Sequence, residues 1–284
     1  MQKTFVVTGS TSGIGLAVAE QLAGMGAFVI GVGRTVERCD AARDFILSAH
    51  PFAEVRYMRA DLALQSHVRD LAERIRVELA SQSLVCLDGL INDAGTFTWH
   101  RSQTQEGFER QWAINHLASF LLTHELLPLL ASAPWARVVT VSSGAHYHTR
   151  LRWNDLQLKH GYNGWLAYKQ SKLANVYFTA ELRRRLGPAS LVQAFAADPG
   201  LVHTDIAVKN NPALVRWFWS RWSRRGLTPA EAAPGVVYLA TETSITKRAE
   251  IYWKHGRPQE PDPLALDPAA GKRLWEISAE MCGL

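Results

Sequence analysis

The sequence predicts an α/β fold: a doubly wound, mostly parallel sheet of seven strands with helices on both faces. Short β-branched and apolar runs alternate along the chain with longer stretches of helical periodicity. The strand-like runs are apolar throughout, which is typical of strands buried in a parallel sheet. Crossovers between parallel strands are right-handed, so the intervening helices cover both faces.

The first half of the chain supplies four strands. TFVVT (4–8) reads as a buried strand, and LAVAEQLAGMG (16–26) has helical spacing and ends in two glycines. AFVIGVG (27–33) and EVRYMRA (54–60) are the next strands, with a helical stretch at 40–50 between them. A helix at 66–80 then leads to the strand CLDGLIND (86–93). Each strand is thus followed by a helix, as a parallel sheet requires.

The second half continues this alternation. A long helix from about 105 to 130 precedes the strand ARVVTVSS (136–143), and a helix at 165–186 precedes LVQAFAAD (191–198). A helix at 230–241 comes before a short strand at 250–253. The proline-rich stretch at 256–268 predicts irregular surface before a final helix. Since no repeat or linker interrupts the series, we expect one domain over 1–284, with a C-terminal extension at 254–284.

Composition is that of a globular protein, with 47% hydrophobic and 20% charged residues. The net charge is +5, but the basic residues are dispersed and form no recognition motif, so we expect no nucleic-acid partner. The three cysteines are far apart, which predicts neither a disulfide framework nor a CxxC metal site. They fit a reducing compartment.

The cellular location is predicted from two stretches. The N-terminus enters a strand almost at once, which leaves no room for a signal peptide. The longest apolar stretch, at 117–131, is broken by a histidine, a glutamate and a proline and is too short to span a bilayer. We therefore expect a cytoplasmic protein.

A glycine-rich loop, TGSTSGIG (8–15), follows the first strand directly and opens the first helix. Such a turn needs glycine where φ is positive and where a phosphate approaches the backbone, and the helix N-terminus attracts a pyrophosphate. The spacing differs from GxGxxG, and the GK[ST] ending of a P-loop is missing. The expected dinucleotide contacts here are Gly9, Ser10, Thr11, Ser12, Gly13, Ile14 and Gly15.

The end of the second strand indicates which dinucleotide binds. An acidic residue there would bind the ribose 2′-OH, but this chain has Gly33 followed by Arg34. A guanidinium can hold a 2′-phosphate through charge-assisted hydrogen bonds, so we expect NADP(H) as the cofactor. The alternative is that Arg34 is a solvated surface residue. Arg38, one helical turn further on, either assists or faces water.

Further motifs match one family in chain order. ADL (60–62) ends the third strand, and NDAG (92–95) ends the fourth. Asn115 lies in WAINHLASF, Ser143 ends VVTVSS, and DPGLVHT (198–204) follows the sixth strand. Of the seven tyrosines, only Tyr168 has a lysine, Lys172, four positions later. With the glycine-rich loop, this series over about residues 3–253 resembles the short-chain dehydrogenase/reductase family and implies a Rossmann-type fold.

The resemblance implies four catalytic residues: Asn115, Ser143, Tyr168 and Lys172. Tyr168 would protonate an alkoxide, and Lys172 on the same helix face would lower its pKa. Ser143 would hold the substrate oxygen, and Asn115 would hold a proton-relaying water. Without the other motifs, the tyrosine–lysine pair would be ordinary helix surface.

The resemblance also implies cofactor contacts beyond the glycine loop. Asp61 would lie against the adenine, although it could equally cap the next helix. Asp93 replaces the second asparagine of the family's NNAG motif, a change from which little effect is expected. The remaining expected contacts are Leu62, Asn92, Ala94, Gly95, Tyr168, Lys172, Pro199, Gly200, Val202 and Thr204.

These residues predict an enzyme, an NADP(H)-dependent oxidoreductase that interconverts a carbonyl and an alcohol. The 25 residues from Ser143 to Tyr168 exceed the family's common interval, and the pattern resembles the retinol dehydrogenase-like and protochlorophyllide reductase-like branch. That branch implies a bulky apolar aldehyde, ketone, retinoid- or steroid-like substrate. The alternative is a non-catalytic NADP(H)-binding sensor, which would not need Ser143, Tyr168 and Lys172 together. An epimerase or dehydratase would show a GxxGxxG loop and a longer substrate domain.

Two features keep several interpretations. The segment at 205–228, expected to be a substrate lid, carries four large aromatic residues among arginines: Trp217, Phe218, Trp219 and Trp222. Core packing, a homodimer or homotetramer contact, and a peripheral membrane helix are the alternatives. His146 and His148, just after the serine, are expected to be polar loop residues, and no metal site is expected.

Overall fold

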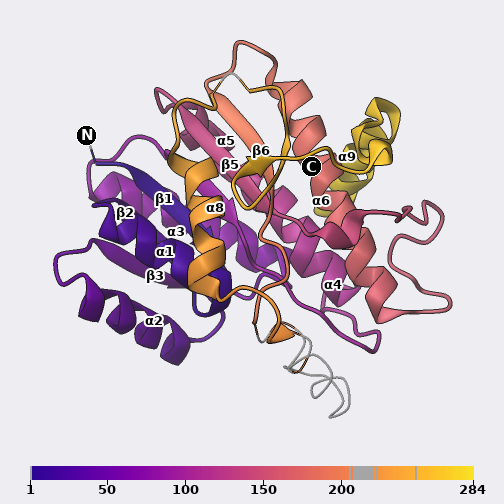
Figure 1. Ribbon diagram of the computed structural model, residues 1–284, viewed down its shortest axis with the longest axis horizontal. Coiled ribbons are helices and arrows are strands. Elements are labelled where there is room, and N and C mark those ends of the chain that lie inside the picture. The colour runs from indigo at the N-terminus through magenta and orange to yellow at the C-terminus, as the bar shows by residue number, and fades with distance from the viewer. Residues whose placement is uncertain (1, 205, 207–220, 222, 247) are drawn as a thin grey trace.

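The computed structural model describes residues 2–204, 206, 221, 223–246 and 248–284 (Figure 1). Their central sheet has eight strands in the order β3-β2-β1-β4-β5-β6-β7-β8. All neighbouring pairs are parallel except β7 and β8. The α/β class is confirmed, and the count of seven strands was short by one. The eighth strand escaped prediction because it has two residues, Arg257–Pro258, inside the proline-rich tail.

The first six predicted strands lie within their predicted ranges, and the seventh is shifted by a residue or two. Their bounds are β1 Thr4–Thr8, β2 Phe28–Gly33, β3 Val55–Arg59, β4 Gly89–Asn92, β5 Ala136–Val141, β6 Val192–Asp198 and β7 Tyr252–Lys254. The longer helices are α1 Gly13–Gly24, α2 Val36–Ala49, α3 Gln65–Ser81, α5 Ala118–Ala131, α6 Gly164–Leu186, α8 Pro229–Thr241 and α9 Pro268–Cys282.

Helices cover both faces of the sheet, as predicted (Figure 1). Alternate residues of β1 point to opposite faces: Phe5 and Val7 join the core beneath α1 and α8, and Val6 joins the core beneath α3, α5 and α6. Sequence order reverses between β1 and β4, where an open α/β sheet leaves a crevice at the carboxyl ends of its strands. That edge lies toward the bottom of Figure 1, where α8 begins.

The long helix expected from residue 105 begins five residues later, at α4 Arg110–Trp112. The buried Glu109 side chain accepts the N–H groups of Gln111 and Trp112, at 3.0 and 2.7 Å, and so caps this start. A π-helical segment, η1 Ala113–Leu117, separates α4 from α5. Such segments are frequent at functional sites, and this one carries Asn115.

The final helix predicted after the proline-rich stretch is present as α9, and the stretch itself is mostly exposed, with Pro261, Asp262 and Ala265 buried. The α9 helix packs on α6 and α5: the Trp275 ring meets Phe120 edge-on at 4.9 Å and stacks on Phe178 at 6.0 Å. The buried His116 Nε2 lies 2.8 Å from Ser278 Oγ. Leu274 on the same helix is buried in the core cluster that also contains residues of α5 and α6.

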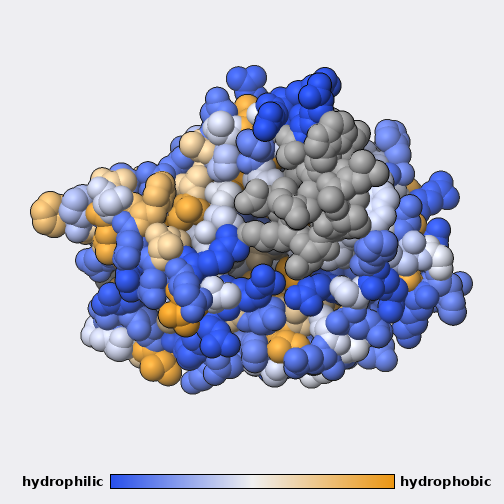
Figure 2. Space-filling view, turned by 90° about the horizontal axis from the view of Figure 1, so that it is seen from below, coloured by the Kyte–Doolittle hydropathy of each residue, from blue (hydrophilic) through white to orange (hydrophobic). Residues whose placement is uncertain are grey.

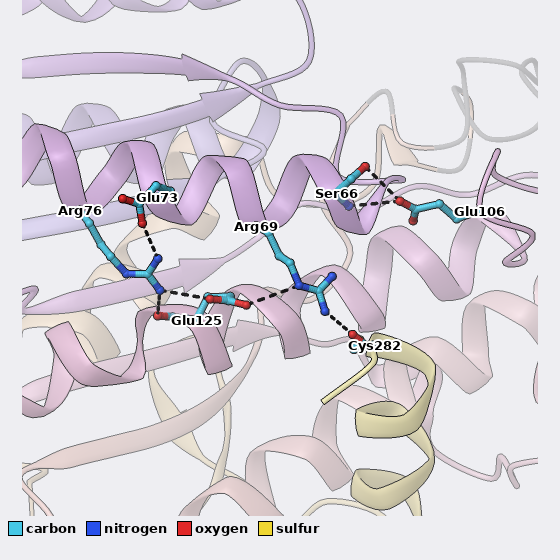
Figure 3. A network of polar contacts seen from close by, with 7 residues as sticks. All are labelled: Ser66, Arg69, Glu73, Arg76, Glu106, Glu125 and Cys282. Atoms are coloured by element: carbon cyan, nitrogen blue, oxygen red, sulfur yellow. Dashed lines mark hydrogen bonds and ion pairs between the residues drawn. The ribbon is translucent and has the colours of Figure 1, made fainter.

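Polar contacts join α3, α5 and the end of α9 (Figure 3). Arg76 pairs with Glu73 and Glu125 at 3.0 and 3.1 Å, and Arg69 lies 3.7 Å from Glu125 and donates to the carbonyl of Cys282. Isolated ion pairs on the surface contribute little to the free energy of unfolding. Here Arg69 and Arg76 of α3 share the Glu125 carboxylate of α5, and so they join two helices. Among the residues that the structure describes, no helix is long and apolar enough to cross a membrane.

Truncating the buried Leu274 side chain of α9 should destabilise the fold. For Leu274→Ala, with the leucine 1% exposed, we expect unfolding free energy to fall by about 2–5 kcal/mol, because a cavity opens between α9 and α6. The matched control, Leu284→Ala, removes a leucine that is 47% exposed in the same tail and should change little. Urea unfolding followed by circular dichroism measures both, and equal midpoints would contradict the packing described.

Candidate active site

One cavity of about 700 Å³ lies at the carboxyl ends of the strands. On the face of the molecule that carries these strand ends, the surface is hollowed near the middle (Figure 2). Residues from both halves of the sheet line this cavity, so motifs far apart in sequence meet there. The predicted site residues that line it are Gly9, Thr11, Ser12, Gly13, Ile14, Arg34, Asp61, Leu62, Ala94, Gly95, Ser143, Tyr168, Lys172, Pro199, Gly200, Val202 and Thr204.

Three predicted cofactor contacts lie behind the cavity wall. The Ser10 hydroxyl accepts the Val32 N–H at 2.9 Å, which ties the glycine loop to β2. The Asn92 amide donates to the Thr123 hydroxyl at 3.0 Å, which ties β4 to α5. Gly15 packs against the backbone of Gly9. These three residues support the wall of the cavity but are not among the residues that line it.

The glycine loop fits a pyrophosphate. Gly9 has φ +70°, and a Cβ there would lie 2.9 Å from the Cα of Ala94, so only glycine is accommodated. Gly13 has φ +61° and is the first residue of α1. The first N–H groups of a helix have no partner within it, and here they begin at the cavity wall.

Two arginines line the end of the cavity beside β2. They are Arg34 and Arg38. A Cβ on Gly33 would come within 2.3 Å of Thr11 Cγ2, so an acidic side chain does not fit at this position. Asp61 accepts the Ala63 N–H at 3.1 Å. It does not cap α3, because Glu106 accepts the first N–H groups of that helix (Figure 3).

The tyrosine, lysine and serine converge in the cavity. Tyr168 and Lys172 are one turn apart on α6, and the lysine Nζ lies 5.6 Å from the centre of the tyrosine ring. The buried Nζ donates to the Val141 carbonyl at 3.0 Å, at the end of β5. Ser143 follows two residues later, and its side chain lowers the pKa of Tyr168. The three predicted side chains therefore line one cavity, where β5 ends against α6.

Electrostatics at the tyrosine differ from the prediction. Burial raises the pKa of Tyr168, and the nearby Asp198 and Asp93 raise it further, while the Ser143 side chain opposes the shift. The expected lowering by Lys172 does not prevail. Burial lowers the pKa of Lys172 to about 8, against the attraction of the same two carboxyls. Around neutral pH the phenol is therefore protonated and the ammonium largely charged.

Asn115 anchors the site from behind. Its amide oxygen accepts the Thr96 N–H at 2.8 Å, and its amide nitrogen donates to the Thr96 carbonyl at 3.0 Å and to the Ser171 hydroxyl at 2.9 Å. Ser171 in turn donates to the Tyr168 carbonyl at 2.8 Å. Asn115 thus fixes the loop after β4 against α6, and its role in a water relay stays a prediction.

Several cavity residues were missed from the sequence. Asp198 accepts the Gly200 N–H at 2.8 Å and the Tyr252 hydroxyl at 2.7 Å, which fixes the loop after β6. Trp165 stacks on Tyr168 with ring centres 5.7 Å apart, and Phe97 meets Tyr168 edge-on at 6.0 Å. The i, i+3 spacing of Trp165 and Tyr168 was the available clue, since such residues share a helix face.

His146 connects the serine loop to the C-terminal tail. Its Nδ1 lies 2.8 Å from the Ser143 carbonyl, and its Nε2 accepts the Asp262 N–H at 3.1 Å. Nδ1 therefore carries the proton, and burial lowers the pKa of this neutral ring. The His148 N–H donates to Asp262 Oδ2 at 2.8 Å. Within the described ranges, no three His, Cys, Asp or Glu side chains gather as metal ligands would.

The predicted lid at 205–228 falls largely on residues outside those the structure describes. Its aromatic residues at 217, 218, 219 and 222 belong to that part. The lid, core, subunit-contact and membrane interpretations of this segment all stay predictions.

Comparison with known proteins shows the family of this chain. The family model of the short chain dehydrogenases matches residues 3–214. Human retinol dehydrogenase 14 is 34% identical, with 99% of this chain and 87% of that protein covered. Bovine dehydrogenase/reductase SDR family member 13 is 36% identical, with coverage of 99% and 74%. The crystal structure of an uncharacterised protein from Mycobacterium paratuberculosis is 32% identical, has a TM-score of 0.74, and covers 99% of this chain and 94% of its own.

The chain therefore belongs to the short-chain dehydrogenase/reductase family and is an oxidoreductase that acts on alcohols or carbonyls. Full-length identity of about 33% to retinol dehydrogenases 11, 12 and 14 places it in the retinol dehydrogenase-like branch.

Removing the imidazole of His146 should impair turnover by loosening Ser143. For His146→Ala we expect kcat for carbonyl reduction to fall about tenfold, because a small displacement of a reacting group is costly. The matched control is His148→Asn: the contact of His148 with Asp262 uses its backbone N–H, and asparagine tolerates its φ of 53°. Steady-state kinetics measures both variants, and an unchanged kcat for His146→Ala would contradict this positioning role.

Proposed function

We propose that this protein is an NADP(H)-dependent enzyme that reduces the carbonyl of a bulky apolar substrate to an alcohol, with Tyr168 as the acid. One observation carries the proposal: Ser143, Tyr168 and Lys172 meet in a single cavity with the start of α1 and two arginines. A protein that only sensed the nucleotide would not need this trio in one cavity.

The arginines support NADP(H). Arg34 and Arg38 place positive charge at the adenosine end of the cavity, where an adenosine 2′-phosphate would lie. An acidic side chain, which would favour NAD(H), is sterically excluded at Gly33. A dehydrogenase from Beutenbergia cavernae, 25% identical with a TM-score of 0.69, was solved with bound NADP.

The protonation states support reduction. A bound NADPH would supply the hydride, which leaves negative charge on the substrate oxygen. The Tyr168 phenol is kept protonated by its surroundings and can give its proton to that oxygen. The Ser143 hydroxyl would hold the same oxygen beside the phenol. The Lys172 ammonium would hydrogen-bond the nicotinamide ribose, and its charge would stabilise the phenolate that remains.

Aromatic rings beside the tyrosine support an apolar substrate. Trp165 lines the cavity and is 42% exposed, so a large apolar face beside the reacting group is open to a ligand. Phe97 lies against both rings. The relatives named retinol dehydrogenase point to the same substrate class, which includes retinoid- and steroid-like carbonyls. A cytoplasmic location and a homodimeric or homotetrameric state stay predictions.

Removing one hydroxyl tests the mechanism. For Tyr168→Phe we expect kcat for carbonyl reduction to fall at least about 100-fold, because the proton donor is lost. NADPH affinity should be preserved, since Lys172 remains. Tyr177→Phe, on the same helix, is the matched control and should keep full activity. Stopped-flow NADPH oxidation with retinal, long-chain aldehydes and cyclic ketones measures the loss, and full activity in Tyr168→Phe would refute the assigned acid.

Removing one guanidinium tests the cofactor. For Arg34→Ala we expect NADPH affinity to fall about 10- to 100-fold and NADH affinity to change little, because only NADPH carries the 2′-phosphate. Arg43→Ala is the control: this arginine also follows β2 but pairs with Asp40 and Asp44 on the exposed face of α2. Fluorescence titration gives both affinities, and an equal loss for the two cofactors would contradict phosphate recognition.

A further inference from the structure

Asp93 is an acidic residue inside the proposed cofactor cavity. It stands directly after β4, at the position where the family's NNAG motif has its second asparagine, and it lines the cavity. Its carboxyl reaches α1: Oδ2 lies 2.6 Å from where a Cβ on Gly15 would be. The Gly15 backbone lowers the pKa of that carboxyl. Sequence reasoning assigned no role to this carboxyl.

The charge of this carboxyl is finely balanced. Burial raises the pKa of Asp93 to about 7, although the Lys172 ammonium and the Gly15 backbone favour the carboxylate. The Asp93 carboxyl interacts electrostatically with Lys172 and Tyr168 on α6. Asp198, at the end of β6, interacts with the same two residues. Near neutral pH the carboxyl is thus about half protonated.

A dinucleotide would bring more negative charge to the same place. The start of α1 is where a pyrophosphate finds unpaired N–H groups and a positive helix end. The Asp93 carboxyl already lies against Gly15 in that first turn. Like charges at one site favour the protonated form of the weaker acid, and here that form is a neutral carboxylic acid.

We propose that the Asp93 carboxyl is a proton-coupled part of the dinucleotide site, which takes up a proton from solvent when a pyrophosphate binds at the start of α1. The inference rests on the proposed binding of a dinucleotide. An asparagine at this position has the same shape and does not titrate, so the coupling is a property of the acid.

The sign of the pH effect follows. Binding raises the pKa of the carboxyl above its value in the free protein, about 7. The added affinity of the protonated form is fully present below pH 7 and is lost as the pH rises from there toward the higher pKa of the complex. Dinucleotide affinity should therefore fall with rising pH above neutrality, and in Asp93→Asn this dependence should be absent.

Isothermal titration calorimetry tests the proposal. NADPH and NADH are titrated at pH 7.0 in buffers of different ionisation enthalpy, so that the protons bound are counted directly. We expect the wild-type protein to take up about half a proton more than Asp93→Asn. Between pH 6.5 and 8.5 the wild-type affinity should fall about tenfold more than that of the variant.

Controls separate the other titrating groups. Lys172 has a pKa of about 8, which the Asp93 carboxylate helps to raise, so its protonation differs between the two proteins. The comparison is therefore repeated in a Lys172→Met background, where only the carboxyl differs. The 2′-phosphate titrates near pH 6 and is absent from NADH. Asp70→Asn is the matched control, because Asp70 pairs with Arg74 on α3 and does not line the cavity.

The outcomes are distinguishable. If neither dinucleotide binds the wild-type protein, the proposed function fails and this inference with it. If both bind and the wild type and Asp93→Asn take up equal numbers of protons, the inference alone is wrong. It is also wrong if Asp93→Asn keeps its circular dichroism spectrum but no longer binds. Should that variant not fold, uptake of less than about a tenth of a proton with NADH by the wild type overturns the inference.

Discussion

The docking of α6 across the carboxyl end of β5 is the contact on which the site depends. Three hydrogen bonds make it: Lys172 Nζ and Asn175 Nδ2 both donate to the Val141 carbonyl, at 3.0 and 3.3 Å, and the Ser142 hydroxyl donates to the Lys172 carbonyl at 2.8 Å. They fix the rotation of the helix relative to the strand. Because Ser143 follows Ser142 and Tyr168 precedes Lys172 by one turn, the same contact sets the distance between the serine and the tyrosine.

This docking has an electrostatic cost. A buried ammonium is unfavourable unless opposite charge or hydrogen bonds compensate, and here a strand-end carbonyl and two carboxyls at the ends of β4 and β6 do so. The compensation is incomplete, since burial still lowers the pKa of Lys172. The same carboxyls raise the pKa of Tyr168. Three adjacent strand ends therefore set the charge of Tyr168, of Lys172 and of the cavity wall together, and a change at one alters the others.

The sequence predicted what local patterns determine and missed what packing determines. Apolar runs predicted the positions of the strands. The motifs predicted Tyr168, Lys172 and Ser143 as site residues, and these three line one cavity. The start of the long helix was placed too early, because the cap at Glu109 is buried by residues distant in sequence, among them Tyr162. Asp93 was judged a minor change, because its effect depends on Gly15 in α1 and Lys172 in α6. Likewise, nothing within the proline-rich tail shows that its Asp262 reaches His146, 116 positions away.

That last contact links two parts of the chain that sequence reasoning treated separately. The segment between Ser143 and Tyr168 contacts the C-terminal extension through three hydrogen bonds. Tyr147 donates to the Glu260 carbonyl, the His148 N–H donates to Asp262, and the Asp262 N–H donates to His146. His146 and Asp262 are both buried. Loss of either partner would leave a buried polar group unpaired, which is costlier than losing both together. The interval and the extension therefore form one structural unit, and this unit contacts the end of β5 through His146 and the Ser143 carbonyl.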